Sequence, residues 1–98
     1  MNDELRIEFK LNKILPKLSK KLGMDYRIVR IGGGFKIFTA ENKPIAYVSL
    51  IDKKFELFDE FNNVPRYLRR NLIKDLRFIT LFDSYGKKLW SSRYIQDE

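Results

Sequence analysis

Residues 26–58 decide the fold and read YRIVRIGGGFKIFTAENKPIAYVSLIDKKFELF. Short runs of β-branched, aromatic and other apolar residues alternate here with turn residues, which stand at positions 32–34, 41–44 and 52–54. Short strand-forming runs with turn chemistry between them are typical of an antiparallel meander. We therefore predict an antiparallel sheet of three to four strands over about residues 26–58.

Side chains alternate between the two faces of a strand. Phe35, Ile37 and Thr39 are therefore expected on one face of this sheet, and Lys36 and Phe38 on the other. Both faces carry apolar residues, so we expect helices on one side and a partly covered or partner-binding surface on the other. The aromatic residues are interpreted as core and cross-strand pairs.

The N-terminal segment admits two interpretations. Alternating apolar residues over 5–11 indicate a strand, whereas a helical period produces one narrow apolar stripe over sixteen residues. The stripe contains Ile7, Leu11, Ile14, Leu15, Leu18 and Leu22. We prefer an amphipathic helix because one rule then organises more of the chain. Pro16 is expected either to kink this helix or to move its start to near Asn12.

A second helix is predicted from about Pro65, because Asn62 and Asn63 are capping-type residues and proline suits a first helical turn. Its apolar stripe is Leu68, Leu72, Leu76 and Ile79. The preferred interpretation ends this helix at about residue 77 and adds a hairpin with strands near 78–82 and 88–94. The alternative continues the helix to residue 82. Either way, residues 1–98 are predicted to form a single α+β domain.

The chain of 98 residues contains neither cysteine nor histidine. This composition excludes disulfides, cysteine and histidine zinc sites, and nucleophiles activated by imidazole. We therefore expect a protein that is not an enzyme and has no cofactor. No apolar run approaches the roughly 18 residues of a membrane span, and no signal-peptide pattern is present, so a cytoplasmic location is expected.

Glycines 32–34 lack the context of a phosphate-binding loop, because Phe35-Lys36-Ile37 follows them in a strand pattern. We interpret them as a structural turn. Residues 32–38 also contain part of the strand signature of RNA-recognition motifs, but Ile31 and Gly33 stand where that signature has a basic residue and an aromatic. Four acids at positions 52, 56, 59 and 60 lack calcium-loop spacing, and no metal site is expected.

The formal net charge of +7 is concentrated in two blocks, residues 10–36, which begin in the first predicted helix, and residues 66–77 in the second predicted helix. Lysine and arginine on one face neutralise phosphates, and arginine binds them with two parallel donors. The candidate nucleic-acid-binding residues are Lys13, Lys17, Lys20, Lys21, Arg66, Arg69, Arg70, Lys74 and Arg77. The helix–strands–helix order is similar in layout to double-stranded-RNA-binding domains, whose second helix presents basic residues to phosphate.

Two functions follow from these patterns. The first is a small non-enzymatic accessory protein that binds nucleic acid or another polyanion through its basic helix faces. The alternative is a protein–protein interaction module or an inhibitor of a larger complex, acting as a homodimer. Tyr85, Trp90 and Tyr94 are the candidate interface residues, because aromatic side chains favour interfaces. The composition, rich in Lys, Asn, Ile and Phe, is typical of a small bacterial or phage protein.

Overall fold

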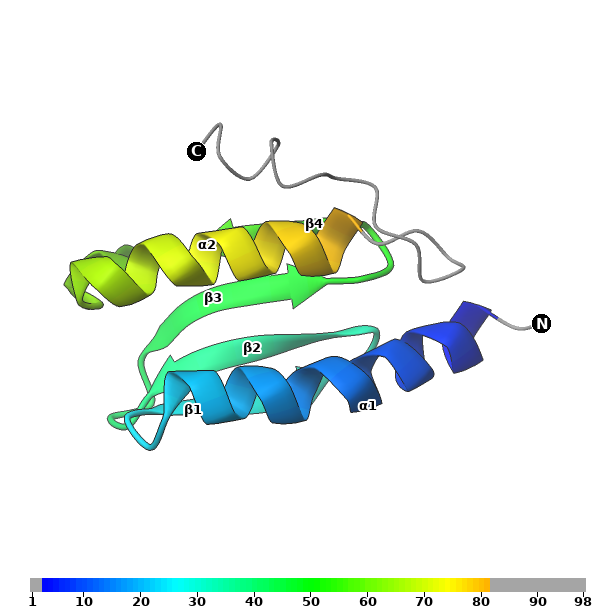
Figure 1. Ribbon diagram of the computed structural model, residues 1–98, viewed down its shortest axis with the longest axis horizontal. Coiled ribbons are helices and arrows are strands. Elements are labelled where there is room, and N and C mark those ends of the chain that lie inside the picture. The colour runs from blue at the N-terminus through cyan, green and yellow to red at the C-terminus, as the bar shows by residue number, and fades with distance from the viewer. Residues whose placement is uncertain (1–2, 82–98) are drawn as a thin grey trace.

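The computed structural model describes residues 3–81. Its elements are α1 (Asp3–Leu22), β1 (Tyr26–Ile31), β2 (Gly34–Thr39), β3 (Pro44–Ser49), β4 (Lys54–Leu57), the 3-10 helix η1 (Asp59–Asn63) and α2 (Arg66–Leu81). The strands form one antiparallel sheet in the order β1-β2-β3-β4 (Figure 1). The predicted α+β class, with a meander between an N-terminal and a second helix, is confirmed.

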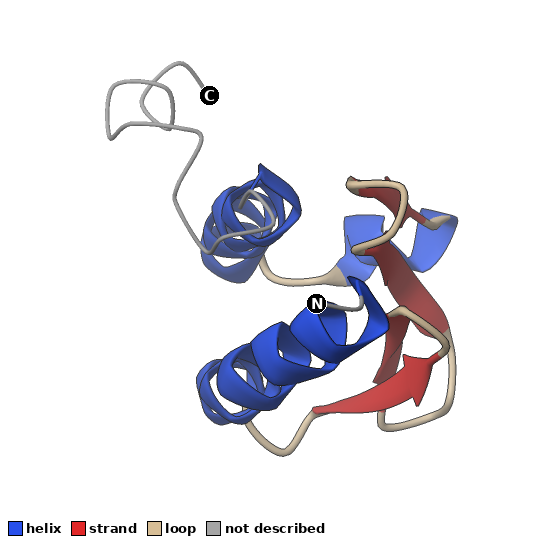
Figure 2. Cartoon of the chain, turned by 90° about the vertical axis from the view of Figure 1, so that its right-hand side faces the viewer, coloured by secondary structure: helices blue, strands red, loops and turns tan. Residues whose placement is uncertain are grey.

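Both helices lie on the same face of the sheet. In Figure 1, α1 runs in front of β1 and β2, and α2 runs in front of β3 and β4. The side view in Figure 2 shows α1 and α2 together on one side of the strands, whereas the short η1 lies beside the strands. No element among residues 3–81 covers the opposite face of the sheet.

The core lies between these helices and the sheet and is built by the two predicted apolar stripes. It contains Leu11, Leu18 and Leu22 from α1, Phe35, Ile37, Ile45, Ala46 and Val48 from the sheet, and Leu68, Leu72, Leu76 and Ile79 from α2, together with Leu50, Phe61 and Val64. Burial of each large apolar side chain contributes roughly 1.5–3 kcal/mol relative to exposure. Packing against the two helices therefore explains the apolar core residues of one sheet face.

The N-terminal segment is one helix that begins at Asp3 and contains Pro16. The helical interpretation is confirmed, and the predicted later start near Asn12 is wrong. Leu5 and Phe9, which completed the strand pattern, are 61% and 63% exposed. The helix buries its own stripe and leaves these two side chains in solvent.

The β1–β2 hairpin turns at Gly32 and Gly33, since Ile31 pairs with Gly34. Gly32 has a φ of +54°, a conformation that glycine adopts without steric cost. A Cβ atom at Gly34 would fall on the backbone carbonyl of Val48 in β3. The glycine run therefore forms a structural turn, as predicted, and Gly34 in addition allows the close approach of β3.

The second helix starts at Arg66, in agreement with the predicted start at about Pro65, but it ends later than the preferred interpretation placed it. Asn62 and Asn63 belong to η1, and the carbonyl of Pro65 accepts the first helical bond of α2, from Arg69 N–H at 2.9 Å. At the other end, α2 continues through Leu81, so the strand predicted from residue 78 is wrong for residues 78–81. The alternative of a continued helix describes them, because Ile79 and Thr80 are buried on the helix. The second predicted strand, 88–94, lies outside the described residues.

Candidate nucleic-acid interface

The exposed side of α1 is basic along most of its length. Lys13, Lys17 and Lys20 are exposed, and residues 9–22 contain no carboxylate. The Lys13 ammonium lies 4.7 Å from the centre of the Phe9 ring, one turn earlier. These lysines span about 10 Å of helix, at a rise of about 1.5 Å per residue.

Lys21 differs from the other lysines of α1. Its ammonium lies 2.8 Å from Asp75 Oδ2 of α2, and the two side chains are 47% and 29% exposed. The predicted binding residue Lys21 is therefore engaged in an ion pair that joins the two helices. Lys21 also lies in the last turn of α1, where its positive charge interacts favourably with the negative end of the helix dipole.

The cations of α2 begin at its first residue. Arg66 and Arg70 are exposed, whereas Arg69, Lys74 and Arg77 are half-buried. The first turn contains no acidic residue, and the helix has a single carboxylate, Asp75, which Lys21 neutralises. Basic side chains beside the positive end of a helix dipole cost roughly 0.3–1 kcal/mol each. Helix stability therefore does not account for arginine at these positions.

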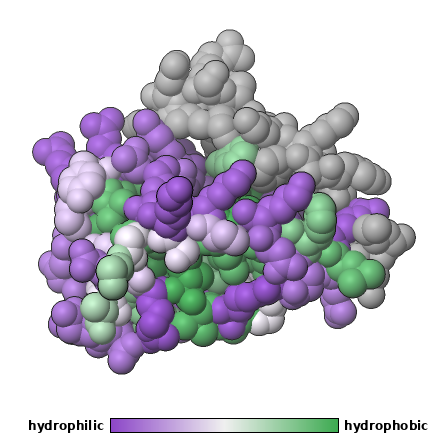
Figure 3. Space-filling view, turned by 60° about the horizontal axis from the view of Figure 1, so that its bottom comes forward, coloured by the Kyte–Doolittle hydropathy of each residue, from purple (hydrophilic) through white to green (hydrophobic). Residues whose placement is uncertain are grey.

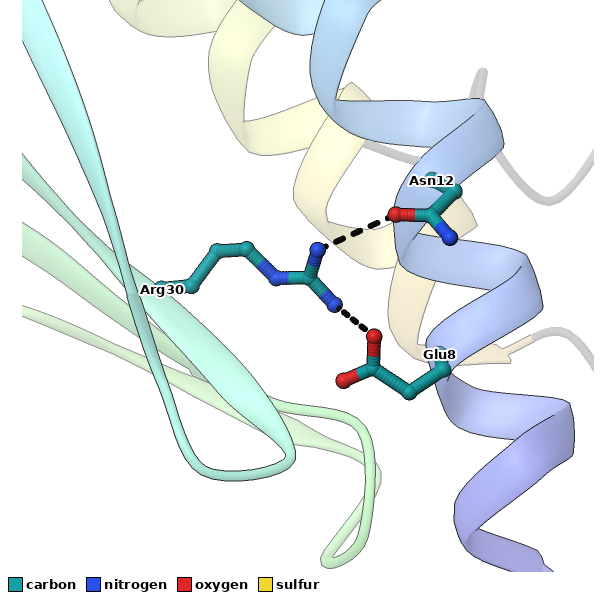
Figure 4. A network of polar contacts seen from close by, with 3 residues as sticks. All are labelled: Glu8, Asn12 and Arg30. Carbon is teal, nitrogen blue, oxygen red and sulfur yellow. Dashed lines mark hydrogen bonds and ion pairs between the residues drawn. The ribbon is translucent and has the colours of Figure 1, made fainter.

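Arg30 is a basic residue whose role is structural. It extends from β1 towards α1, where its guanidinium donates to Glu8 Oε1 at 2.5 Å and to Asn12 Oδ1 at 3.0 Å (Figure 4). This contact fastens the N-terminal half of α1 to the edge strand. It also neutralises the last carboxylate of α1, so the remainder of that helix stays positive.

The open face of the sheet presents aromatic rings and cations, among them Lys36 and Phe38, which alternation along the strand places there. The strand register aligns Val29, Lys36, Tyr47 and Glu56 in one row across the four strands. Phe38, in the neighbouring row, is half-buried. Phe35 is a core residue, and Phe38 lies on the other face of the sheet, as the alternation predicts; Phe38, Tyr47 and Phe58 are half-buried.

Figure 3 views the molecule from the side of α1 and β1. Most of this surface is hydrophilic, and hydrophobic side chains reach it in the lower half of the view. The exposed large hydrophobic residues among residues 3–81 are Leu5, Phe9, Met24, Ile31, Ile51, Leu57 and Tyr67. The molecule therefore combines a charged helix layer with scattered apolar positions at its surface.

Few features of the described chain suggest catalysis. Burial raises the pKa of the Tyr26 phenol, and nearby Asp25 and Tyr67 add smaller contributions, so this phenol stays protonated at neutral pH. Within residues 3–81, no three acidic side chains gather as they would around a metal ion. No helix in the same range is long and apolar enough to cross a membrane.

Comparisons of the chain with protein families, with curated proteins and with solved structures find no match. The candidate interface residues Tyr85, Trp90 and Tyr94 lie outside residues 3–81. A functional proposal therefore rests on the helix cations and on the open face of the sheet.

Proposed function

We propose that this protein is a non-enzymatic nucleic-acid-binding protein that contacts phosphates with the exposed cations of α1 and α2. The observation that carries the proposal is the start of α2. Arg66, Arg69 and Arg70 gather there without an acidic residue in the first turn, at a place where basic side chains are unfavourable for the helix. A bound phosphate reverses that penalty, because anions are stabilised at helix N-termini.

The charges of the helix layer support the same proposal. Glu8 and Asp75 are both paired within the chain, with Arg30 and Lys21. The exposed cations on the outer surface of α1 lie on the same side of the sheet as α2 (Figures 1 and 2). A polyanion that lies across the two helices therefore meets a surface of one sign. Neutralising its phosphates releases counterions, which gives affinity that falls with salt.

The test is a fluorescence anisotropy titration of a mixed-sequence duplex at about 50 mM and about 200 mM salt. Arg70→Gln removes an exposed cation of α2, and the expected result is weaker binding with a salt slope shallower by about 0.9. Lys43→Gln removes one exposed cation of the β2–β3 turn, outside both helices, so it serves as the charge-matched control and leaves the slope unchanged. Absence of duplex binding at the lower salt concentration contradicts the proposal.

A second function, contact with another protein, is favoured by one observation. Leu5 and Phe9 lie one turn apart on α1, and both side chains are more than half exposed. Two exposed apolar side chains in this position could contact another protein or a second copy of the chain. Light scattering of the wild type and of Phe9→Ser tests this alternative, which requires an assembly in the wild type that the variant loses.

A further inference from the structure

The open face of the sheet combines aromatic rings with cations. Its rings, called here the sheet-face rings, are Phe38, Tyr47 and Phe58. Its cations, called the sheet-face cations, are Arg27, Lys36 and Lys54. The other side chains that the register places on this face are Val29, Ile31, Pro44, Glu56 and the buried Ser49. No element among residues 3–81 lies over this surface.

The register fixes which side chains share this face. Lys36 pairs with Tyr47 on β3, and Arg27 pairs with Phe38 on β2. Phe58 follows β4 directly, and its extended backbone turns it away from Leu57, whose partner Ala46 is buried in the core. The sheet-face rings therefore lie on three neighbouring strand paths, about 4.8 Å apart from one path to the next.

Two of these rings already hold a cation. The Arg27 guanidinium lies 5.1 Å from the centre of the Phe38 ring, and the Lys36 ammonium lies 5.5 Å from the centre of the Phe58 ring. Arg27 also donates a hydrogen bond to the side chain of Asn42 in the β2–β3 turn. Each of these cations thus lies over the face of an aromatic ring before any partner is present.

The net positive charge of the strand residues on this face favours an anionic partner. Three cations oppose a single carboxylate, Glu56, among the strand residues that point this way. Two copies packed face to face would bring these cations against one another, which is unfavourable. An anionic partner that carries planar rings satisfies both features at once, because rings stack on rings and cations bind its negative groups.

We propose that the open sheet face binds single-stranded nucleic acid, with bases stacked on the sheet-face rings and phosphates bound by the sheet-face cations. A duplex does not fit this role, because its bases already stack on one another inside the helix. The surface lies on the opposite side of the sheet from the helix cations (Figure 2). The inference therefore stands independently of the phosphate contacts proposed for α1 and α2.

The experiment measures the anisotropy of a labelled single-stranded oligonucleotide, and of a duplex of the same length, with the full chain at about 50 mM salt. Phe38→Leu and Phe58→Leu keep an apolar side chain and remove the ring. Each is expected to weaken single-strand binding about fivefold or more and to leave duplex binding unchanged. Phe9→Leu is the matched control, because it removes an exposed ring on α1 and should leave single-strand affinity unchanged.

Circular dichroism and the melting temperature of each variant show whether it folds. Lys36→Gln gives a second approach that leaves all three rings in place. It is expected to lower single-strand affinity and to reduce the salt slope by about 0.7.

Three outcomes overturn the inference. The first is that the wild type does not bind the single strand at low salt. The second is that folded Phe38→Leu and Phe58→Leu bind it as tightly as the wild type. The third is that light scattering shows a dimer that Phe38→Leu dissociates, because the face then binds a second copy of the chain. If the duplex binds and the single strand does not, only this inference fails. If the single strand binds and the duplex does not, only the helix proposal fails.

Discussion

The two faces of the sheet differ in burial, although the same strands form both. Phe35, Ile37 and Val48 point towards the helices and are completely buried. Their strand neighbours Lys36 and Phe38 point away and stay partly exposed. Packing accounts for the buried residues of the covered face, because each fills the space between two layers. Packing does not account for the ring–cation pairs of the open face, which is why that face is the better place to look for a partner.

The largest expected effect compares one residue from each face. Ile37→Ala removes a fully buried side chain and is expected to lower the free energy of unfolding by about 2–5 kcal/mol. Phe38→Leu, on the next residue, keeps most of its volume at a half-buried site and should cost less than about 1.5 kcal/mol. Urea unfolding of the two variants measures both values. Equal losses would show that the open face is part of the core.

A smaller loss of stability is expected at Gly34, where the backbones of β2 and β3 lie closest together. Gly34→Ala places a methyl group on the Val48 carbonyl, and we expect a loss of about 1–3 kcal/mol. Gly33→Ala is the control, because its methyl group meets only the end of the Ile51 side chain, which is 64% exposed and can rotate away. Thermal melts rank the two variants, and a larger loss at Gly33 would contradict the close approach of β2 and β3.

In the helix layer, one substitution is expected to raise stability while it removes function. Arg66→Glu replaces a cation by an acid at the first residue of α2. We expect it to raise the free energy of unfolding by about 0.3–1 kcal/mol, because a negative charge is stabilised at the positive end of the helix dipole. Duplex affinity is expected to fall in the same variant. Unfolding and anisotropy measured on one preparation check both results. If the variant is less stable than the wild type, or binds the duplex as well, the arginines of α2 are not placed there for phosphate binding.

The smallest expected effect concerns the ion pair between the helices. A double-mutant cycle with Lys21→Met and Asp75→Asn should give a coupling free energy below about 1 kcal/mol that declines with added salt, since both side chains are partly exposed. Urea unfolding at low and high salt provides the four free energies. A coupling well above this value would mean that the pair orients the two helices.

Local patterns in the sequence predict most of the fold. The stripe that contains Leu11 and Leu18, the turn residues of the meander, and the stripe that contains Leu72 and Leu76 each act within a few residues. The end of α2 was harder to predict, because a short apolar run such as residues 78–82 fits a strand and a helix equally well.

The candidate site was less predictable, because it depends on contacts between distant parts of the chain. Alternation separates Phe38 from Phe35, but it does not reveal which face the helices cover. The pairings of Lys21 with Asp75 and of Arg30 with Glu8 join residues that are far apart in the sequence. These contacts decide which cations are compensated, and they appear only once α1 has been placed against the sheet and α2.

The central claim is that this protein binds nucleic acid with two separate surfaces. One anisotropy titration tests it, in which wild type, Arg70→Gln and Phe38→Leu are each measured with a duplex and with a single strand at low salt. The predicted result is a crossed pattern: Arg70→Gln weakens duplex binding most, and Phe38→Leu weakens single-strand binding most. Failure of the wild type to bind either nucleic acid, or equal losses of both affinities in both variants, would contradict the claim.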